Sequence, residues 1–594
     1  MRSATAPLRF RHACHYGAEL LPEGGARFRL WAPDAPLVEL LLGDSVLPMH
    51  RAADGTHEVV APQAQADMTY AYRVDDGGPV PDPASRAQLG DVEGPSRIVD
   101  PLAYTWRTGT WHGRPWAQAV ICEVHVGTCG GFAGLREQLP RLAAAGYTAI
   151  ELMPIAEFPG ARNWGYDGVL PYAPESSYGT PDELKALVDA AHELGLVLLL
   201  DVVYNHFGPR GNALGRYASA FFEHDRPTPW GEAIDFTRSA VRRFYIDNAL
   251  LWINEYRFDG LRLDAVHAIA PEDFLLELAA AVRQACAKER HVHLVLENEH
   301  NAAHLLERAF DAQWNDDGHN ALHVLLTGEQ HSYYADFAAN PTAQLATVLA
   351  EGFAFQGQPT RHGLPRGEAS AHLPPTAFVL FAQNHDQIGN RPLGERLSTL
   401  TSVAAMRAVT ALVALTPMIP LFFMGDEWGC RTSFLFFTDY QGELARQVSA
   451  GRREEFKAFS AGGKRAPRLP DPNAPATYDQ SLPRVHSPVA AQRWSAWFTQ
   501  LLHIRRVALV PALDGARAID CLVLDTAAVL ARWRLGDGRV WELAANLGPA
   551  PARIPACDAT EYPVYAVPVR AGTSRCAGDL PAYSVVVRVS AAQS

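Results

Sequence analysis

The sequence lacks a long apolar run and an excess of positive charge. Its longest apolar stretch, residues 411–424, is interrupted by Pro417 and Pro420 and is too short to cross a bilayer. The net charge of −13 argues against nucleic acid or an anionic membrane as a partner. The first residues contain charges and a proline without a continuous apolar core, so we expect no signal peptide.

Motifs that would announce a disulfide framework or a nucleotide cofactor are also missing. The 8 cysteines show no CxxC pair and no regular spacing, which is typical of scattered thiols in a reduced cytoplasm. No GxxxxGK motif followed by Ser or Thr is present, and no GxGxxG motif opens a helix. A nucleophile elbow is absent as well. We therefore expect a cytoplasmic protein that uses no nucleotide cofactor and no serine triad of that type.

The chain of 594 residues is too long for a single hydrophobic core. Residues 1–110 contain alternating strand-like runs between turn residues, which predict an N-terminal β-sandwich that resembles carbohydrate-binding modules. Residues 111–508 alternate buried strands with amphipathic helices, which favours a (β/α)8 TIM barrel over an open sheet. Residues 509–594 return to strand-like runs and predict a C-terminal antiparallel β-domain.

Acidic and polar residues follow the expected barrel strands. One strand ends in Asp201, with Asn205 and His206 beyond it, and the next ends in Asp264. A third ends in Glu297, and a later one runs into residues 384–386 (Asn-His-Asp). Active sites of such barrels lie at the C-terminal ends of the strands, so these side chains should meet at one mouth.

Three carboxylates at one barrel mouth are what glycoside cleavage requires. Arg262 precedes Asp264 by two positions, so both side chains share a strand face and the guanidinium should keep Asp264 ionised as a nucleophile. Glu297 follows an apolar strand, where desolvation favours a protonated acid. Asp386 could support the charge of the transition state, and Asn205, His206 and His385 are neutral partners suited to a sugar. In a retaining enzyme the acid and the nucleophile lie about 5–5.5 Å apart.

Two simpler interpretations compete with this one. Arg262 and Asp264 could form only a structural salt bridge. Alternatively, a metal could be bound by the four side chains of Asp201, His206, His385 and Asp386. The remaining histidine pairs accompany no HExxH motif. We expect no catalytic metal, since the ordered carboxylates are explained better by glycosidase chemistry.

Four segments in this order resemble the motifs of the α-amylase family of glycoside hydrolases. They are residues 201–206 (Asp-Val-Val-Tyr-Asn-His), residues 260–264 (Gly-Leu-Arg-Leu-Asp), the strand that ends in Glu297, and residues 384–386 (Asn-His-Asp). The resemblance implies a (β/α)8 barrel and a retaining double displacement.

The same resemblance implies a role for each matching residue. Asp264 would be the nucleophile, Glu297 the acid/base and Asp386 the transition-state stabiliser. Arg262, His206 and His385 would hold the sugar in the cleavage subsite. Residues 164–168 (Trp-Gly-Tyr-Asp-Gly) are similar to a loop of the family whose tyrosine stacks on that sugar, which points to Tyr166.

Finer signals are similar to the trehalohydrolase members of the family. They include residues 123–128 (Glu-Val-His-Val-Gly-Thr), residues 313–317 (Gln-Trp-Asn-Asp-Asp) and residues 321–329. This resemblance implies hydrolysis of the α-1,4 bond that joins trehalose to the maltooligosaccharide in maltooligosyl trehalose. Gly318 stands where that group has a bulkier aromatic, so the structure after Asp317 is left open.

Substrate choice requires a subsite for trehalose beyond the cleaved bond. His267 lies just past the nucleophile, at a position similar to the family's leaving-group subsite, and Glu299 and Asn301 could bond trehalose hydroxyls. Phe355 is a candidate platform for a sugar ring. Each of these four residues has an alternative role in packing. A branching or debranching enzyme on the same scaffold remains the alternative function.

Overall fold

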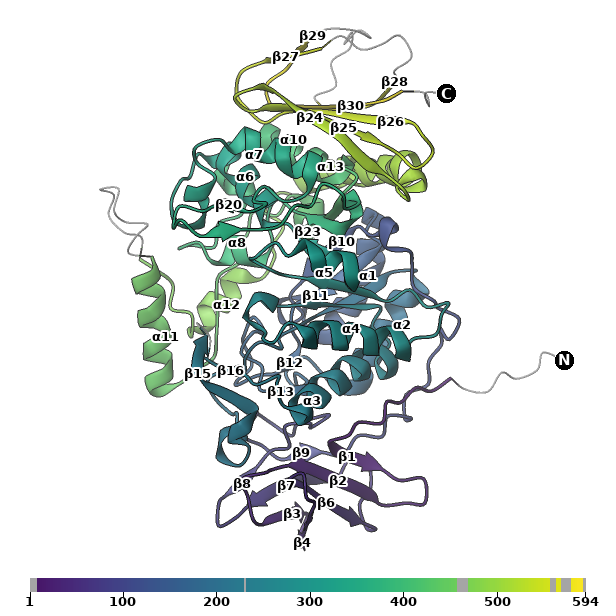
Figure 1. Ribbon diagram of the computed structural model, residues 1–594, viewed down its shortest axis with the longest axis vertical. Coiled ribbons are helices and arrows are strands. Elements are labelled where there is room, and N and C mark those ends of the chain that lie inside the picture. The colour runs from purple at the N-terminus through teal and green to yellow at the C-terminus, as the bar shows by residue number, and fades with distance from the viewer. Residues whose placement is uncertain (1–7, 229–230, 457–467, 556–561, 568–577, 591–594) are drawn as a thin grey trace, which may run out of the picture.

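A closed barrel of eight parallel strands forms the centre of the molecule in the computed structural model, which describes residues 8–228, 231–456, 468–555, 562–567 and 578–590 (Figure 1). Each strand pairs in parallel with its neighbours, and the last strand pairs with the first. The strands are, in spatial order, β10 (Ile121–Val124), β11 (Ala149–Leu152), β14 (Val197–Val202), β17 (Gly260–Leu263), β18 (His293–Leu296), β19 (Ala312–Trp314), β22 (Phe378–Leu380) and β23 (Ile419–Phe423). The predicted TIM barrel is confirmed.

The barrel interior is apolar in its lower layers and charged near the C-terminal ends of the strands. A buried cluster that includes Ile121, Leu199, Val295 and Leu421 fills the lower part. Because side chains alternate between the two faces of a strand, the inward positions one step further along β10 and β14 are Glu123 and Asp201. The sequence pattern therefore places charged groups directly at the mouth.

The sixth barrel strand, β19, was not recognised from the sequence. It has only three residues, Ala312–Trp314, and its central residue is the polar Gln313. A run this short carries no periodicity, so its strand character comes from pairing with β18 and β22.

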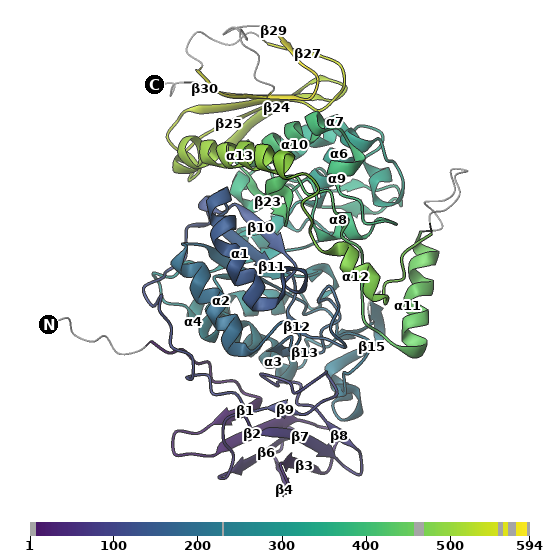
Figure 2. The same ribbon diagram turned by 180° about the vertical axis from the view of Figure 1, so that it is seen from behind.

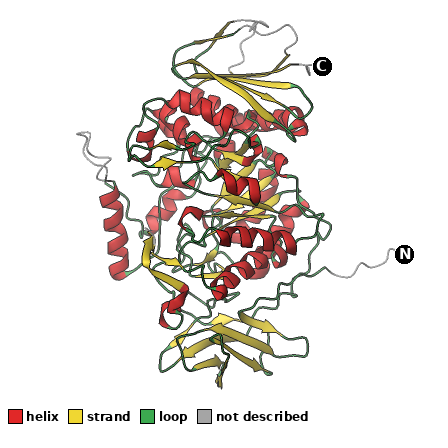
Figure 3. Ribbon diagram, in the orientation of Figure 1, coloured by secondary structure: helices red, strands yellow, loops and turns green. Residues whose placement is uncertain are grey.

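Helices cover the outside of the barrel, as the red elements in Figure 3 show. The helix α2 begins with a capping box in which Thr180 and Glu183 satisfy each other's backbone N–H groups, with Pro181 at the first helical position. The main covering helices are α1 (Gly131–Ala145), α2 (Pro181–Glu193), α3 (Ser239–Leu250), α4 (Asp273–Ala285), α5 (Ala303–Arg308), α6 (Asp316–Thr327), α7 (Pro341–Glu351), α10 (Val403–Leu415) and α13 (Pro488–Ile504).

Smaller elements connect the strands on the mouth side of the barrel. The helix α11 stands away from the barrel in both Figure 1 and Figure 2, with α12 between them. These elements are β12 (Ala156–Glu157), β13 (Leu170–Pro174), β15 (Phe222–Thr228), β16 (Gly231–Ile234), β20 (Gln358–Pro359), β21 (Pro365–Arg366), α8 (His385–Gly389), α9 (Leu397–Leu400), α11 (Gly442–Glu455) and α12 (Pro475–Ser481).

Two antiparallel sheets at the N-terminal end of the molecule form the predicted sandwich. Phe28 of one sheet packs edge-to-face on Tyr70 of the other, with ring centroids 5.0 Å apart. Arg86 anchors this unit to the barrel through a buried ion pair of 2.7 Å with Glu255. The first sheet contains β1 (Gly17–Leu20), β2 (Ala26–Trp31), β6 (Thr56–Ala61) and β5 (His50–Arg51); the second contains β4 (Ser45–Pro48), β3 (Val38–Leu42), β7 (Thr69–Val74), β8 (Pro79–Val80) and β9 (Ser96–Arg97).

The C-terminal unit lies at the opposite end of the molecule and is antiparallel, as predicted (Figure 1). It packs on α10, where the indole N–H of the buried Trp541 donates to the carbonyl oxygen of Leu415 at 2.9 Å. In the described part of the chain, no helix has the length and apolar character needed to cross a membrane. The strands are β24 (Arg517–Asp525), β25 (Ala528–Arg534), β26 (Val540–Asn546), β30 (Ser584–Ser590) and β28 (Tyr562–Val567), with β27 (Ala552–Ile554) and β29 (Gly578–Leu580) in a separate pair.

Candidate active site at the barrel mouth

Arg262 connects the acidic groups of the mouth. Its side chain is fully buried on β17, and its Nη1 atom lies 2.8 Å from both carboxylate oxygens of Asp201 and 2.7 Å from Oδ1 of Asp264. The Nη2 atom of the same guanidinium lies 4.0 Å from Oε2 of Glu297. The guanidinium also lies 4.2 Å from the ring centre of Trp314, which packs against it. One cation therefore gathers three carboxylates from neighbouring strands.

Asp264 directly follows β17 and is held from two sides. Oδ1 accepts from Arg262, and Oδ2 accepts a hydrogen bond of 3.0 Å from the Nδ2 group of Asn205. The side chain is 15% exposed, so it can meet a substrate. Ala265 then adopts a left-handed conformation with φ of 42°, and its backbone N–H donates to Oε2 of Glu297 at 2.5 Å. This turn fixes the two carboxyl groups beside each other.

Glu297 lies in an environment that favours the protonated form of its carboxyl group. Burial raises its pKa well above the usual value; Arg262 acts against this rise, and the charges of Asp264, Asp316 and Asp386 add to it. This raised pKa favours the protonated form that a group needs in order to give its proton to a leaving oxygen. The desolvation expected from the sequence is present.

His385 connects Asp386 to Glu123 of the barrel strand β10. Nδ1 of His385 lies 2.5 Å from Oε1 of Glu123, and its Nε2 lies 3.3 Å from Oδ1 of Asp386. Burial alone would lower the pKa of His385, but the carboxylates of Asp386 and Glu123 outweigh it and raise that pKa well above its usual value. Burial likewise opposes ionisation of Asp386, but the His385 cation lowers its pKa. These contacts favour the charged form of His385, whereas the sequence suggested a neutral one, because Glu123 lies far from His385 along the chain.

Tyr166 and His206 form one side of the mouth. The Tyr166 hydroxyl donates to Oδ2 of Asp201 at 2.7 Å, and its ring stacks on His385 with centroids 5.0 Å apart. His206 bonds through Nε2 to the carbonyl oxygen of Tyr166 at 3.1 Å and through Nδ1 to the side chain of Asn205. The structure thus brings together all the residues that the family motifs had indicated.

His267 and Glu299 lie together at the edge of the same mouth. The backbone N–H of Glu299 donates to Nδ1 of His267 at 3.3 Å, and the Glu299 side chain is 71% exposed. Burial lowers the pKa of His267, which favours its neutral form. The exposed Glu299 carboxylate therefore lies beside His267, two residues after Glu297.

Asn301 and Phe355 have a different role from the one expected. The Asn301 side chain is buried, donates to Asp317 at 2.9 Å and accepts from Gln313 at 3.3 Å. The Phe355 ring is also buried and packs edge-to-face on Phe337, with centroids 5.5 Å apart. Both side chains stabilise the loop, so the predictions of a trehalose contact at Asn301 and a sugar platform at Phe355 are not supported.

Asp316 is a mouth residue that was not selected from the sequence. It lies in the first turn of α6, two residues after β19 and its Trp314. Burial and the charge of Asp386 raise its pKa to about 7. The signal in the sequence was the acidic pair at 316–317, but only recognition of β19 as a strand would have placed Asp316 at the mouth. The neighbouring Gly318 belongs to the same helix, which resolves the structure after Asp317.

Within the described residues, no group of three or more His, Cys, Asp or Glu side chains is arranged to hold a metal ion. His319 bonds to the Ala382 carbonyl oxygen and to the Tyr334 hydroxyl, and His323 bonds to Glu329 at 2.8 Å. This histidine pair therefore has structural partners.

Comparison with known proteins agrees with the barrel and its motifs. Residues 100–227 match the model of the α-amylase catalytic domain, and residues 516–587 match a domain of unknown function (DUF3459). The malto-oligosyltrehalose trehalohydrolase of Deinococcus radiodurans is 41% identical over 476 residues, which cover 78% of each chain. The chain belongs to the malto-oligosyltrehalose trehalohydrolase family, within the α-amylase group of glycoside hydrolases.

Two further proteins are similar to this chain, one over nearly its whole length and one over less than half of it. A crystal structure described as a putative alpha amylase from Salmonella typhimurium has a TM-score of 0.91 and 41% identity, and the match covers 98% of this chain and 100% of that one. A 1,4-alpha-glucan branching enzyme of Nocardia farcinica is 35% identical over 280 residues, which cover only 43% of this chain and 38% of that protein. The match to the Deinococcus radiodurans trehalohydrolase is thus more extensive than the match to the branching enzyme.

Proposed function

We propose that this protein is a cytoplasmic retaining glycosidase that releases trehalose from maltooligosyl trehalose. Its substrate is a neutral oligosaccharide, and the reaction requires no cofactor, nucleic acid or membrane. The observation that carries the proposal is the shared guanidinium of Arg262, which contacts Asp264 at 2.7 Å and lies 4.0 Å from Glu297, whose pKa is raised by burial. A nucleophile and an acid on one cation are the pair that retaining cleavage requires.

The reaction proceeds by double displacement, in two steps. The Asp264 carboxylate attacks the anomeric carbon, while Glu297 gives its proton to the glycosidic oxygen and the trehalose part leaves as an alcohol. Glu297, now a carboxylate, takes a proton from water, and the hydroxide attacks the glycosyl–Asp264 ester to give the maltooligosaccharide and free Asp264. Asp386, held as an anion by His385, supports the positive charge of the oxocarbenium-like state.

The sugar in the cleavage subsite is held by groups around the nucleophile. Tyr166 offers its ring, and Asn205, His206, Arg262 and His385 supply or orient hydrogen-bond donors. His267 and Glu299 contact each other and follow Asp264 and Glu297 by three and two residues, so they suit the hydroxyls of trehalose, which is the leaving group. We also propose the three units 1–110, 111–508 and 509–594 as the domains of the chain.

A product assay with purified protein tests this proposal. Maltooligosyl trehalose and a plain maltooligosaccharide of similar length are incubated separately without added cofactor. We expect free trehalose from the first and little cleavage of the second. Equal cleavage of both, or new α-1,6 branches in the second, would assign the chain to a branching or debranching activity instead. The variant Asp264→Asn, of nearly equal size, should lose almost all turnover while it still binds the sugar; retained turnover would exclude Asp264 as the nucleophile.

A further inference from the structure

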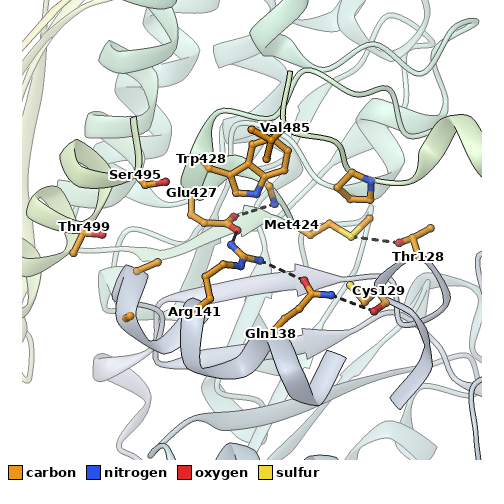
Figure 4. A pocket seen from close by; sticks show the side chains of 14 residues that line it. Thr128, Cys129, Gln138, Arg141, Met424, Glu427, Trp428, Val485, Ser495 and Thr499 are labelled. Atoms are coloured by element: carbon orange, nitrogen blue, oxygen red, sulfur yellow. Dashed lines mark hydrogen bonds and ion pairs between the residues drawn. The ribbon is translucent and has the colours of Figure 1, made fainter. Parts of the chain in front are cut away.

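A hollow of about 530 Å³ lies outside the barrel, between α1, α13 and the loop that follows β23 (Figure 4). We call it the α1–α13 hollow. Its volume is typical of small-molecule sites, which span about 300–1,000 Å³. None of the three proposed catalytic carboxyl groups lines it. Its lining residues are Thr128, Cys129, Gln138, Arg141, Ala144, Ala145, Met424, Gly425, Glu427, Trp428, Pro483, Val485, Ser495 and Thr499.

Small side chains on two facing helices create this space. Gln138, Arg141 and Ala145 are spaced three and four residues apart on α1, so they share one face of that helix. Ser495 and Thr499 are four residues apart and share one face of α13. Helices that pack directly fill such an interface with interlocking side chains. Here alanine, serine and threonine are too short to do so, and the hollow remains open.

The charged groups of the hollow neutralise each other. Arg141 forms an ion pair with Glu427, whose side chain is only 2% exposed, and Glu427 also accepts from the Gly425 backbone N–H at 2.9 Å. A second N–H group of Arg141 points towards Oε1 of Gln138 at 3.4 Å. Figure 4 shows this paired group below Trp428. Because the charges of Arg141 and Glu427 are paired, the hollow has no net attraction for an anion or a cation and suits a neutral polar ligand.

Three hydrogen-bonding groups of the lining are unused within the described residues. They are the hydroxyl groups of Ser495 and Thr499 and the indole N–H of Trp428. All three residues are half-buried and line the hollow. Trp428 also offers an aromatic surface beside these donors. An aromatic surface next to hydroxyl, amide and paired charged groups matches a pyranose, which has an apolar face and a ring of hydroxyls.

We infer that the α1–α13 hollow is a second saccharide site, which binds a glucose ring of a linear α-1,4-glucan away from the catalytic mouth. The ring packs on Trp428, and its hydroxyls bond to Ser495, Thr499 and the Arg141–Glu427 pair. The choice of an α-glucan as the ligand rests on the proposed function. The site itself rests on the unused groups and the neutral charge of the hollow.

Calorimetry on the full-length Asp264→Asn variant tests this inference, since that variant does not consume its ligand. Maltotriose is the first probe and trehalose the second. We expect two classes of maltotriose site. Ser495→Phe should weaken one class at least tenfold by filling the hollow and should leave the other unchanged. Thr499→Val, which removes one hydroxyl at nearly constant volume, should weaken the same class about threefold to tenfold, which is about 0.6–1.4 kcal/mol. Ala496→Phe is the matched control, because Ala496 is exposed on α13 and does not line the hollow.

A single class of maltotriose site in the parent variant would overturn the inference. So would two classes that both survive Ser495→Phe, or a second class that takes trehalose and not maltotriose. If Ser495→Phe does not fold, the Thr499→Val result decides: an unchanged second class overturns the inference. Failure of the proposed function is separate, because it appears as the absence of trehalose release by the unmodified protein.

Discussion

Replacing Arg262 by lysine should separate the role of its geometry from that of its charge. The guanidinium is fully buried and places one nitrogen within 2.8 Å of Asp201 and Asp264 while the other faces Glu297 at 4.0 Å. Lysine keeps the positive charge but has a single nitrogen and no planar fork, so it cannot keep all of these contacts. We expect one carboxylate to lose its direct hydrogen bond.

The size of the effect follows from the bond that is lost. A hydrogen bond to a charged group contributes about 1.5–3 kcal/mol. If Asp264 is the carboxylate that loses alignment, about 2 kcal/mol of transition-state stabilisation corresponds to a reduction in kcat of about 30-fold. The free energy of unfolding should fall by about 2–3 kcal/mol, because a buried carboxylate is left with weaker pairing.

The assay combines kcat for maltooligosyl trehalose with urea unfolding of the same preparation. Arg505→Lys is the matched control, because Arg505 is equally buried but bonds to the backbone oxygens of Ala414, Thr416 and Met418, far from the mouth. This control should lose stability and keep kcat within about twofold. A kcat of Arg262→Lys within threefold of the unmodified protein would refute the proposed role of the shared guanidinium.

Two further predictions concern the pH dependence of the reaction. Because burial and neighbouring carboxylates raise the pKa of Glu297, kcat/KM should fall as the pH rises through that pKa and the acid loses its proton. A pH profile of kcat/KM without an alkaline decline would contradict the assignment of Glu297 as the acid. Glu297→Gln, which has no proton to give, should reduce turnover at least a thousandfold. Burial and the charge of Asp386 raise the pKa of Asp316 to about 7, and the negative charge of Asp316 helps to raise the pKa of Glu297. Asp316→Asn should therefore move the alkaline decline of kcat/KM to lower pH, by up to about one unit, and an unchanged or upward-shifted decline would show that Asp316 does not act on Glu297.

The barrel could be predicted because most of its strands are apolar runs that end in a polar residue. Strands such as β14 and β23 are buried along their whole length, which gives a clear signal in the sequence. The strand β19 was not predicted because three residues are too few to show a pattern, and Asp316, which follows it, was therefore not selected. Asn301 and Phe355 were selected by their place in the sequence near Glu297 or in an aromatic loop. The left-handed backbone of Asn301, with φ of 52°, belongs to a turn whose side chain bonds to the buried Asp317.

The division of roles between the two carboxyl groups depends on distances that no motif specifies. Arg262 is in direct hydrogen-bond contact with Asp264 at 2.7 Å but remains 4.0 Å from Glu297. Coulomb attraction falls with distance, so the same cation supports a negative charge on Asp264 more strongly than on Glu297. Burial and the surrounding carboxylates then outweigh Arg262 at Glu297 and raise its pKa. The residues of this pair are visible in the sequence, but their proposed separation into nucleophile and acid depends on how β17 and β18 place them around one guanidinium.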